Sequence, residues 1–352
     1  MVTQQQEQTK AYVLAGIFTL SLRLIVGWTY FSAFWRRLVL ENKLIPDSSG
    51  YIGEKFNHFL PNSIGIKPII EYLVSTPDLL WWAMLIFTLV EGVVGLLYML
   101  GFFTRLMSIG VFSLAFGILL GSGWLGTTCL DEWQIGILGV AAGFTIFLSG
   151  GGKYSLDHLF QSKLSKKKWL VWLTSGELPL PIKQFSKVAI TGAILLFILT
   201  LYTNQEFHNG VWGPLHNKSV KPKLEISNAD IHNDALNFKV YRIEGADVYG
   251  SFLIGITLKD SRGKTILQKD GEELSRFPLT GIKNDYIAKV TPGKHSLIIP
   301  LGSKATLTIK DSSLQNLPKG RYELTLTDIS GITWKQDITA VSYTHLTLPT
   351  IA

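Results

Sequence analysis

Five long apolar runs constrain the fold of this 352-residue chain more than any other feature. A helix needs about 20 residues to cross a hydrocarbon core of about 30 Å, and about 17 is the lower limit. Four of the runs reach that length, and the fifth does so if its last residues lie among the headgroups. The runs are Ala11–Trp35, Leu79–Phe103, Leu106–Trp124, Trp133–Ser149 and Lys187–Tyr202. We therefore predict an integral membrane protein, with the first run retained as a helix rather than cleaved as a signal peptide.

Lysines in one short loop predict the orientation of these helices. The segment Gly150–Lys187 has seven lysines against two acidic residues, so we expect it in the cytoplasm. Counting helices from that segment places the N-terminus inside and the long loop 36–78 outside. The fifth helix then delivers the rest of the chain to the outside. The predicted location is the bacterial inner membrane, with several membrane passes and a periplasmic C-terminal domain.

The sequence pattern changes from helical to alternating after about Lys221. Eight short runs rich in β-branched and aromatic residues follow, separated by turn signals such as DSRGK and TPGK. This spacing predicts an antiparallel β-sandwich. The last residues, Ser342–Ala352, continue no strand and resemble a non-native read-through tail. The predicted fold class is thus a membrane all-α bundle of four helices plus a connecting fifth, N-in and C-out, followed by an extracytoplasmic all-β sandwich. The predicted parts are the bundle (1–160), the basic loop and fifth helix (161–204), the β-sandwich (205–341) and the tail (342–352).

Arg23 and Glu91 are the sharpest candidates for function. Each is the one charged residue in a 25-residue apolar run and lies at its midpoint. The two helices run in opposite directions, so we expect both charges at one depth and paired. A charge at mid-membrane costs about 2.5–3.5 kcal/mol on insertion scales, and an Arg–carboxylate pair offsets much of that cost. Two interpretations stay open: a structural clasp, or the polar end of a quinone or substrate pocket in which Glu91 relays protons.

The expected outer loops contain further candidates. Arg36 and Arg37, with His58, are candidates for an anion site. Cys129 lies close to Asp131 between Trp124 and Trp133. A nearby carboxylate raises the pKa of a thiol, so we interpret Cys129 first as a structural thiol. A transient adduct with a sulfur substrate and intermolecular pairing are the alternatives.

Several classes of site are missing from the sequence. A single Cys leaves no intrachain disulfide, CxxC pair or Cys-built metal site. No zinc-helix spacing, haem motif, flavin site or dinucleotide fingerprint is present. The net charge of +7 is concentrated in the basic loop, where it suits membrane topology and anionic lipid rather than nucleic acid. Glycines in the apolar runs, among them Gly27, Gly92, Gly95, Gly136, Gly139 and Gly143, are interpreted as packing surfaces.

Five segments carry a likeness to a known family. They are SLRLIVGWTYF, EGVVGLLYMLGFFTR, GTTCLDEW, LSGGGKYSLDHLF and NGVWGPLHN. The first four resemble DoxD/DoxX-type four-helix membrane proteins, and the last, with the β-rich body, resembles DoxA. Over residues 11–341 the chain resembles a fusion of the two small subunits of a thiosulfate:quinone oxidoreductase.

The resemblance implies oxidation of thiosulfate to tetrathionate, with electrons passed to membrane quinone. For this reaction we hypothesise that Arg23, Glu91 and Trp28 contact quinone, with Arg23 and Glu91 as the catalytic residues. Arg36, Arg37, His58, Trp124, Cys129, Asp131 and Trp133 would contact the sulfur anion. The predicted partners are membrane lipid, quinone, a small anionic sulfur compound, and a second copy of the chain or an additional subunit.

Two alternatives remain at the level of sequence. The first is a non-catalytic membrane module whose β domain binds a periplasmic partner. The second is a transporter, which five helices without an inverted repeat argue against.

Overall fold

The computed structural model describes residues 2–48, 50–125, 132–160, 168–176, 178, 180–232, 234–246, 251–315 and 317–340. The chain divides into two compact units. The first comprises residues 1–55, 62–69 and 76–218, and the second comprises 56–61, 70–75 and 219–352. The predicted tail lies outside the described residues.

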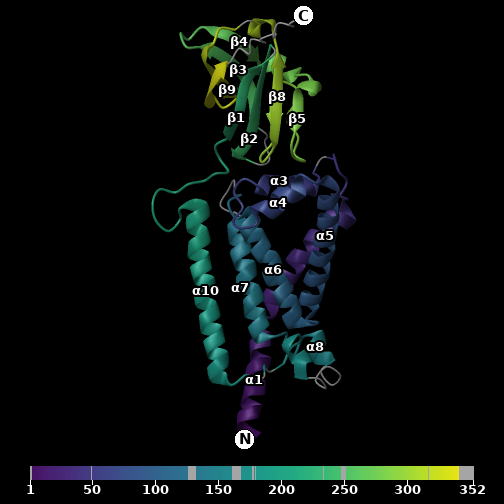
Figure 1. The fold of residues 1–352 in the computed structure, drawn as a ribbon. Coiled ribbons are helices and arrows are strands. Elements are labelled where there is room, and N and C mark those ends of the chain that lie inside the picture. Colours follow the sequence, from purple (N-terminus) through teal and green to yellow (C-terminus); the bar gives the residue numbers. More distant parts are fainter. Residues whose placement is uncertain are drawn as a thin grey trace, which may run out of the picture. The chain divides into compact units, whose positions relative to one another are not determined.

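The helices of the chain have the order that the apolar runs predict (Figure 1). Their bounds are α1 Val2–Phe18, α2 Leu20–Phe34, the π-helix Trp35–Leu40, α3 Ile52–Phe59, α4 Lys67–Val74, α5 Pro77–Leu100, α6 Thr104–Ser122, α7 Glu132–Ser149, α8 Leu156–Leu159, the 3₁₀ helix Lys168–Trp172 and α10 Ile182–His208. Four of them, α5, α6, α7 and α10, are long and apolar enough to cross a membrane. This result confirms the predicted helical bundle. The N-in, C-out orientation stays a prediction.

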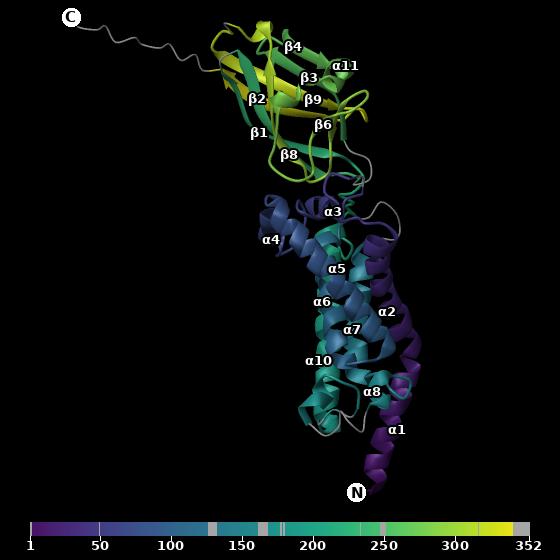
Figure 2. The same cartoon turned by 90° about the vertical axis from the view of Figure 1, so that its right-hand side faces the viewer.

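The first apolar run forms a bent helix pair rather than one straight helix. The chain breaks at Thr19, and residues 10–18 and 20–40 meet at an angle of 49°. Figure 2 shows α1 continuing into α2. Beyond Phe34 the helix continues through the π-helical turns of Trp35–Leu40. The helix after the bend therefore covers residues 20–40, whereas the apolar run covers residues 11–35.

Small residues allow the helices of the bundle to pack closely. A Cβ atom on Gly95 of α5 would lie 2.4 Å from the backbone nitrogen of Phe31 on α2. A Cβ on Gly136 of α7 would lie 2.8 Å from the Cβ of Leu119 on α6. Atoms do not approach that closely, so only glycine fits at these crossings. The interpretation of these glycines as packing surfaces agrees with the structure.

Two antiparallel sheets form the β domain. One has the strand order β1-β2-β8-β5, and the other has the order β10-β9-β3-β7-β6 with β4 paired to β3. The bounds are β1 Lys223–His232, β2 Ala235–Glu244, β3 Ser251–Asp260, β4 Thr265–Asp270, β5 Ile282–Asn284, β6 Thr291–Pro292, β7 Leu297–Ile299, β8 Lys304–Lys310, β9 Gly320–Asp328 and β10 Thr333–Ala340. The eight predicted runs correspond to β1–β4 and β7–β10. The short α11 (Gly271–Ser275) follows β4 and begins with a capping box between Asp270 and Glu273.

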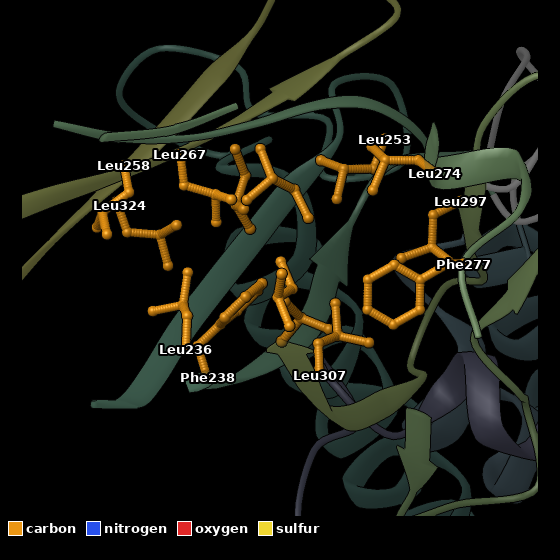
Figure 3. Close-up of a cluster of buried hydrophobic side chains, with 14 of the residues drawn as sticks. Leu236, Phe238, Leu253, Leu258, Leu267, Leu274, Phe277, Leu297, Leu307 and Leu324 are labelled. Carbon is orange, nitrogen blue, oxygen red and sulfur yellow. The ribbon is translucent and has the colours of Figure 1, made fainter. Parts of the chain in front are cut away.

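Alternate side chains of these strands face one hydrophobic core. Figure 3 shows Leu236, Phe238 and Leu307 of the first sheet opposite Leu258 and Leu324 of the second. Successive residues of a strand point to opposite faces, so the period of two places one residue in two inside. This arrangement confirms the predicted antiparallel β domain.

Candidate functional site

A buried ion pair joins the end of the first bent helix to the middle of α5. The Nη1 atom of Arg37 lies 2.7 Å from Oε2 of Glu91. The side chain of Arg37 is 16% exposed and that of Glu91 is 5% exposed. A charge-assisted hydrogen bond of this length is among the strong polar contacts in proteins. We call this contact the Arg37–Glu91 pair.

Two further side chains of α5 support Arg37. Its Nη1 also donates to Oγ1 of Thr88 at 3.2 Å, and its guanidinium lies 5.8 Å from the ring centroid of Phe87. Phe87 and Thr88 precede Glu91 by four and three residues, so all three lie on one face of the helix. The guanidinium is thus held by a carboxylate, a hydroxyl and an aromatic face.

The local backbone places Arg37 at this position. Arg37 lies in the π-helical turns that follow α2, and such wide turns occur frequently at functional sites. Below it, α2 packs directly on α5, because a Cβ on Gly92 would lie 2.6 Å from the ring of Phe34. The close packing of the two helices brings the carboxylate within reach of the arginine.

The predicted pairing of Arg23 with Glu91 is wrong. The Nη1 of Arg23 donates to the carbonyl oxygen of Gly151 at 3.0 Å, and its Nη2 donates to the carbonyl oxygen of Tyr154. A Cβ on Gly101 would overlap the Arg23 guanidinium. Gly101 lies ten residues beyond Glu91, which is about 15 Å along the helix axis. The two charges are at different depths because α2 packs on α5 in another register than the run midpoints predict, with Gly27 against Met99 and Phe34 against Gly92.

Arg23 belongs to a polar cluster at the α7–α8 end of the bundle. The carboxylate of Asp157 accepts hydrogen bonds from the backbone N–H groups of Phe103, Thr104 and Ser175 at 2.8–2.9 Å. It also accepts from the hydroxyls of Thr104 and Ser175 at 2.7 and 2.9 Å. This carboxylate satisfies N–H groups at the start of α6 that have no partner within the helix.

Arg105 completes that cluster. Its guanidinium donates to the carbonyl oxygens of Phe147, Val171, Thr174 and Gly176 at 2.5–3.0 Å. The side chain is fully buried, so these four acceptors replace water around the charge. Arg105 thereby ties the end of α7 to residues 171–176.

The other predicted quinone and anion contacts are dispersed. Trp28 is 55% exposed on the surface of α2. Arg36 is also exposed, and its Nε donates to the carbonyl oxygen of Ser32 at 3.3 Å. His58 belongs to the second unit, whereas Arg36 and Arg37 belong to the first. Their grouping as an anion site therefore stays a prediction.

Aromatic side chains gather where α6 ends and α7 begins. Trp124 is fully buried, and its indole N–H has no hydrogen-bond partner among the described residues. The indole N–H of Trp133 donates to Oγ1 of Thr203 on α10 at 2.9 Å. His208 lies edge-on to Trp133 with ring centroids 6.2 Å apart. Cys129 and Asp131, the other candidates in this loop, lie outside the described residues.

The β domain has a surface cleft of about 550 Å³ beside α11. Lys269 lines it and pairs with Glu273 at 3.0 Å and with Asp311 at 2.9 Å. The backbone N–H of Ser313 and the ammonium of Lys269 lower the pKa of Asp311 to about 2. The hydrogen bond to Asp311 raises the pKa of Lys269 above its ordinary value. Lys269, Glu273 and Asp311 are therefore paired with one another.

The sequence analysis did not identify Thr88 and Tyr30 as buried polar residues of the bundle. Tyr30 is 5% exposed and packs in the core of the bundle. It lies midway between Arg23 and Arg37, seven residues from each, and this spacing places all three on one stripe of a helix. That spacing, and the i, i+3 relation of Thr88 to Glu91, could have identified both residues from the sequence. Within the described ranges, no group of three or more His, Cys, Asp or Glu is placed to hold a metal ion.

Fold and site together define a class: an apolar helical bundle with a buried Arg–carboxylate pair, joined in one chain to an antiparallel β-sandwich. The family models identify both parts. Residues 18–181 match the TQO (thiosulfate:quinone oxidoreductase) small subunit DoxD, and residues 207–337 match the TQO small subunit DoxA. The chain belongs to these families and is a fusion of DoxD with DoxA.

Proposed function

We propose that this protein is a membrane-bound, quinone-linked oxidoreductase that converts thiosulfate to tetrathionate. The observation that carries the proposal is the presence of both TQO small-subunit families in one chain. In this reaction two thiosulfate dianions join through a new S–S bond to form one tetrathionate dianion. The two electrons released reduce one quinone, which takes up two protons to become quinol.

The Arg37–Glu91 pair supports a role in the quinone half of this reaction. Reduction of quinone requires protons inside an apolar bundle, and a buried carboxylate is a group that transfers protons. Glu91 would deliver a proton to a quinone oxygen, while N–H groups of Arg37 would orient that oxygen. Thr88 and Phe87 would hold the guanidinium while Glu91 changes its charge.

The anion half of the reaction would take place at the outer face. Thiosulfate is a dianion and does not cross a bilayer, so it would meet the exposed Arg36 and the segment that joins α6 to α7. The proposed substrate contacts of the first unit are Arg36, Trp124, Cys129, Asp131 and Trp133. Arg37 is engaged by Glu91, so Arg36 is the better cation for the substrate. We place the β domain in the periplasm of a bacterial cell, as the basic loop predicts.

Quinol formation by the purified full chain tests the proposal. The chain in lipid nanodiscs receives thiosulfate and a short-chain quinone, and quinol and tetrathionate are measured together. We expect one tetrathionate for each quinol. A folded chain that forms neither product would contradict the proposal and favour a non-catalytic module, an alternative that the words "small subunit" in both family descriptions support.

Replacement of Glu91 tests its part in the reaction. We expect Glu91→Gln to lower the rate of quinol formation at least tenfold, because the amide cannot deliver a proton. Glu272 offers a matched control, since its Oε1 pairs with Nη2 of Arg276 at 2.8 Å on the surface of the β domain. Glu272→Gln should leave the rate unchanged. Equal rates for Glu91→Gln and wild type would remove Glu91 from the mechanism.

A further inference from the structure

A short loop follows α10 and presents large apolar side chains outward. The loop comprises residues 209–216, and we call it the α10 loop. Its residues Val211, Trp212 and Leu215 are 40%, 68% and 83% exposed. A cluster of large exposed apolar side chains marks an interaction surface. Figure 1 shows the α10 loop beside the end of α10, on the side away from α7.

The side-chain amide of Gln205 on α10 fixes the conformation of this loop. Its Oε1 accepts hydrogen bonds from the backbone N–H groups of Val211 and Trp212 at 3.2 and 3.1 Å. Its Nε2 donates to the carbonyl oxygen of Trp212 at 3.3 Å. Further along, the backbone N–H of His216 donates to the carbonyl oxygen of His208 at 2.9 Å. The α10 loop is therefore an ordered turn that is held against the last turns of α10.

These hydrogen bonds suit an apolar environment. A backbone N–H or C=O group that leaves water without a partner is strongly unfavourable. A loop in water does not need such partners, because the solvent supplies them. Here the amide of Gln205 satisfies both the N–H and the carbonyl oxygen of Trp212. The indole of Trp212 and its own backbone can therefore leave water together.

The α10 loop also continues the apolar surface of α10. Every residue in the most apolar stretch of α10 is at least partly exposed, and the helix is long enough to cross a membrane. Near the end of the helix, Ile198 and Tyr202 are each 54% exposed. An exposed apolar surface of a membrane-spanning helix contacts lipid. This continuity favours lipid as the partner of the α10 loop.

The spacing between the two ends of the bundle agrees with a bilayer. At the end with the α10 loop, Nε2 of His208 lies 3.1 Å from the carbonyl oxygen of Gly123, which follows α6. At the other end, the backbone N–H of Leu106 donates to the carbonyl oxygen of Leu173, next to Trp172, which is 41% exposed. Gly123 lies 17 residues after Leu106, or about 26 Å along the helix, and a hydrocarbon core is about 30 Å thick. Exposed tryptophans with this separation correspond to the two aromatic belts of a membrane protein.

The charge of the sequence around the α10 loop is that of a membrane-surface contact. Residues 207–224 include Lys218, Lys221 and Lys223 and have no acidic residue. Basic residues next to a membrane are attracted to anionic headgroups. A protein partner would require neither the satisfied loop backbone nor the bilayer spacing of the exposed tryptophans. Lipid accounts for both.

We propose that the α10 loop is a membrane anchor that inserts into the headgroup layer of the bilayer. Trp212 and Leu215 lie at the boundary between headgroups and acyl chains, and Gln205 holds their backbone. Lys218 meets the lipid phosphates. The anchor fixes the end of α10 at one depth and keeps the segment that leads to the β domain at the membrane surface. This role is independent of the redox reaction.

Quenching of a single fluorescent label by lipid tests the anchor. Cys129 is the one cysteine of the chain, so a Cys129→Ser background accepts a nitrobenzoxadiazole label at one introduced cysteine. Leu215→Cys is compared, in the full chain in nanodiscs, with Ile194→Cys on α10 and Ile329→Cys in the β domain, where the native side chains are 54% and 64% exposed. A nitroxide on the acyl chain close to the headgroup should quench the label at 215 about twofold. A nitroxide deep in the acyl chain should quench the label at 194 more strongly, and neither should quench the label at 329.

Two results would overturn the proposal. The first is a label at 215 that both nitroxides quench as weakly as the label at 329, because that label would be in water. The second is a blue-shifted emission from the label at 215 without quenching by either nitroxide. In that case protein, such as a second copy of the chain, covers the α10 loop instead of lipid.

Substitutions in the labelled chain test the residues that form the anchor. We expect Trp212→Ser and Gln205→Ala each to reduce the quenching at 215 by about half, because the first removes the interfacial ring and the second leaves loop backbone groups without their partner. The matched control Trp172→Ser removes an exposed tryptophan at the other end of the bundle and should leave the quenching unchanged. Full quenching in both loop variants would contradict the anchor. The label at 215 in the chain with an unchanged Gln205 and Trp212 decides the question if these variants do not fold.

Discussion

Breaking the Arg37–Glu91 pair should destabilise the bundle strongly. Glu91→Gln leaves the guanidinium buried beside a neutral amide, and Arg37→Met leaves the carboxylate without its cation. Removal of one partner of a buried ion pair costs about 3–5 kcal/mol, and an unpaired charge at mid-membrane costs about 2.5–3.5 kcal/mol. The side chain of Arg37 is 16% exposed, so it keeps some contact with solvent when the pair is broken. We therefore expect each single change to cost about 3 kcal/mol, at the lower end of these ranges.

The double variant Arg37→Met/Glu91→Leu should recover most of that loss. It removes both charges and fills their space with apolar side chains of similar volume. Replacement of a buried pair in this way is often neutral or stabilising. We expect the double variant to unfold within about 1 kcal/mol of the wild type, so that the two single effects are strongly non-additive.

Thermal unfolding and turnover, measured on the same nanodisc samples, separate the two roles of the pair. A loss of about 3 kcal/mol corresponds to a fall in Tm of about 6–12 °C for a domain of about 200 residues. The exposed Arg276–Glu272 pair, 77% and 72% exposed, should contribute little when broken. A double variant that is stable but inactive assigns a catalytic role to the pair, whereas a stable and active one leaves only the clasp. Single variants as stable as the wild type would refute the reasoning about burial.

Three further substitutions test other contacts. Gly101→Ala should lower stability by about 2 kcal/mol or more in thermal unfolding, because Gly101 has φ of +68° and its Cβ would overlap Arg23. Asp157→Asn should cost about 2 kcal/mol, measured in the same way, because it weakens charge-assisted hydrogen bonds to backbone N–H groups. The pKa of Asp311 is lowered to about 2, so its carboxylate stabilises the β domain above about pH 4 and loses this effect as the pH falls toward 2. Asp311→Asn should therefore cost about 1 kcal/mol at pH 7, after allowance for solvent around the contact with Lys269, and the difference from wild type should shrink as the pH falls through about 2.

The apolar runs and the alternating strands were sufficient to predict the long helices of the first unit and eight strands of the second, but not the short elements such as α3, α4, β5 and β6. A continuous run of about 20 apolar residues has one stable state in a bilayer, because a helix satisfies its own backbone. The alternation in β2 and β9 follows from one buried and one outer face of each sheet. The order of strands within each sheet was not predictable, because the pairing of β2 with β8 joins segments about 70 residues apart and no local signal specifies it.

The depth of the buried charges was the main error of the sequence analysis. The midpoint of an apolar run locates a charge only if the helix is straight and ends where the run ends. Here the hydroxyl of Thr19 donates to the carbonyl oxygen of Ala15 at 2.8 Å, where the helix bends. At the other end, π-helical turns extend the helix to Leu40. The register of α2 on α5, with Gly27 against Met99 and Phe34 against Gly92, places Arg37 rather than Arg23 beside Glu91, and no local sequence signal specifies it.

The two arginines of this stripe therefore make different contributions. The partners of Arg23 at the α8 end are backbone carbonyls, which cannot change their charge. The partner of Arg37 is a carboxylate, which can take up and release a proton. Our proposal therefore assigns proton transfer at this stripe to the carboxylate of Glu91. For this reason we expect Arg23→Lys to lower the Tm, because lysine cannot reach both carbonyls with a planar fork, while the folded fraction retains the turnover of the wild type. Loss of turnover without loss of stability in Arg23→Lys would contradict this division of roles.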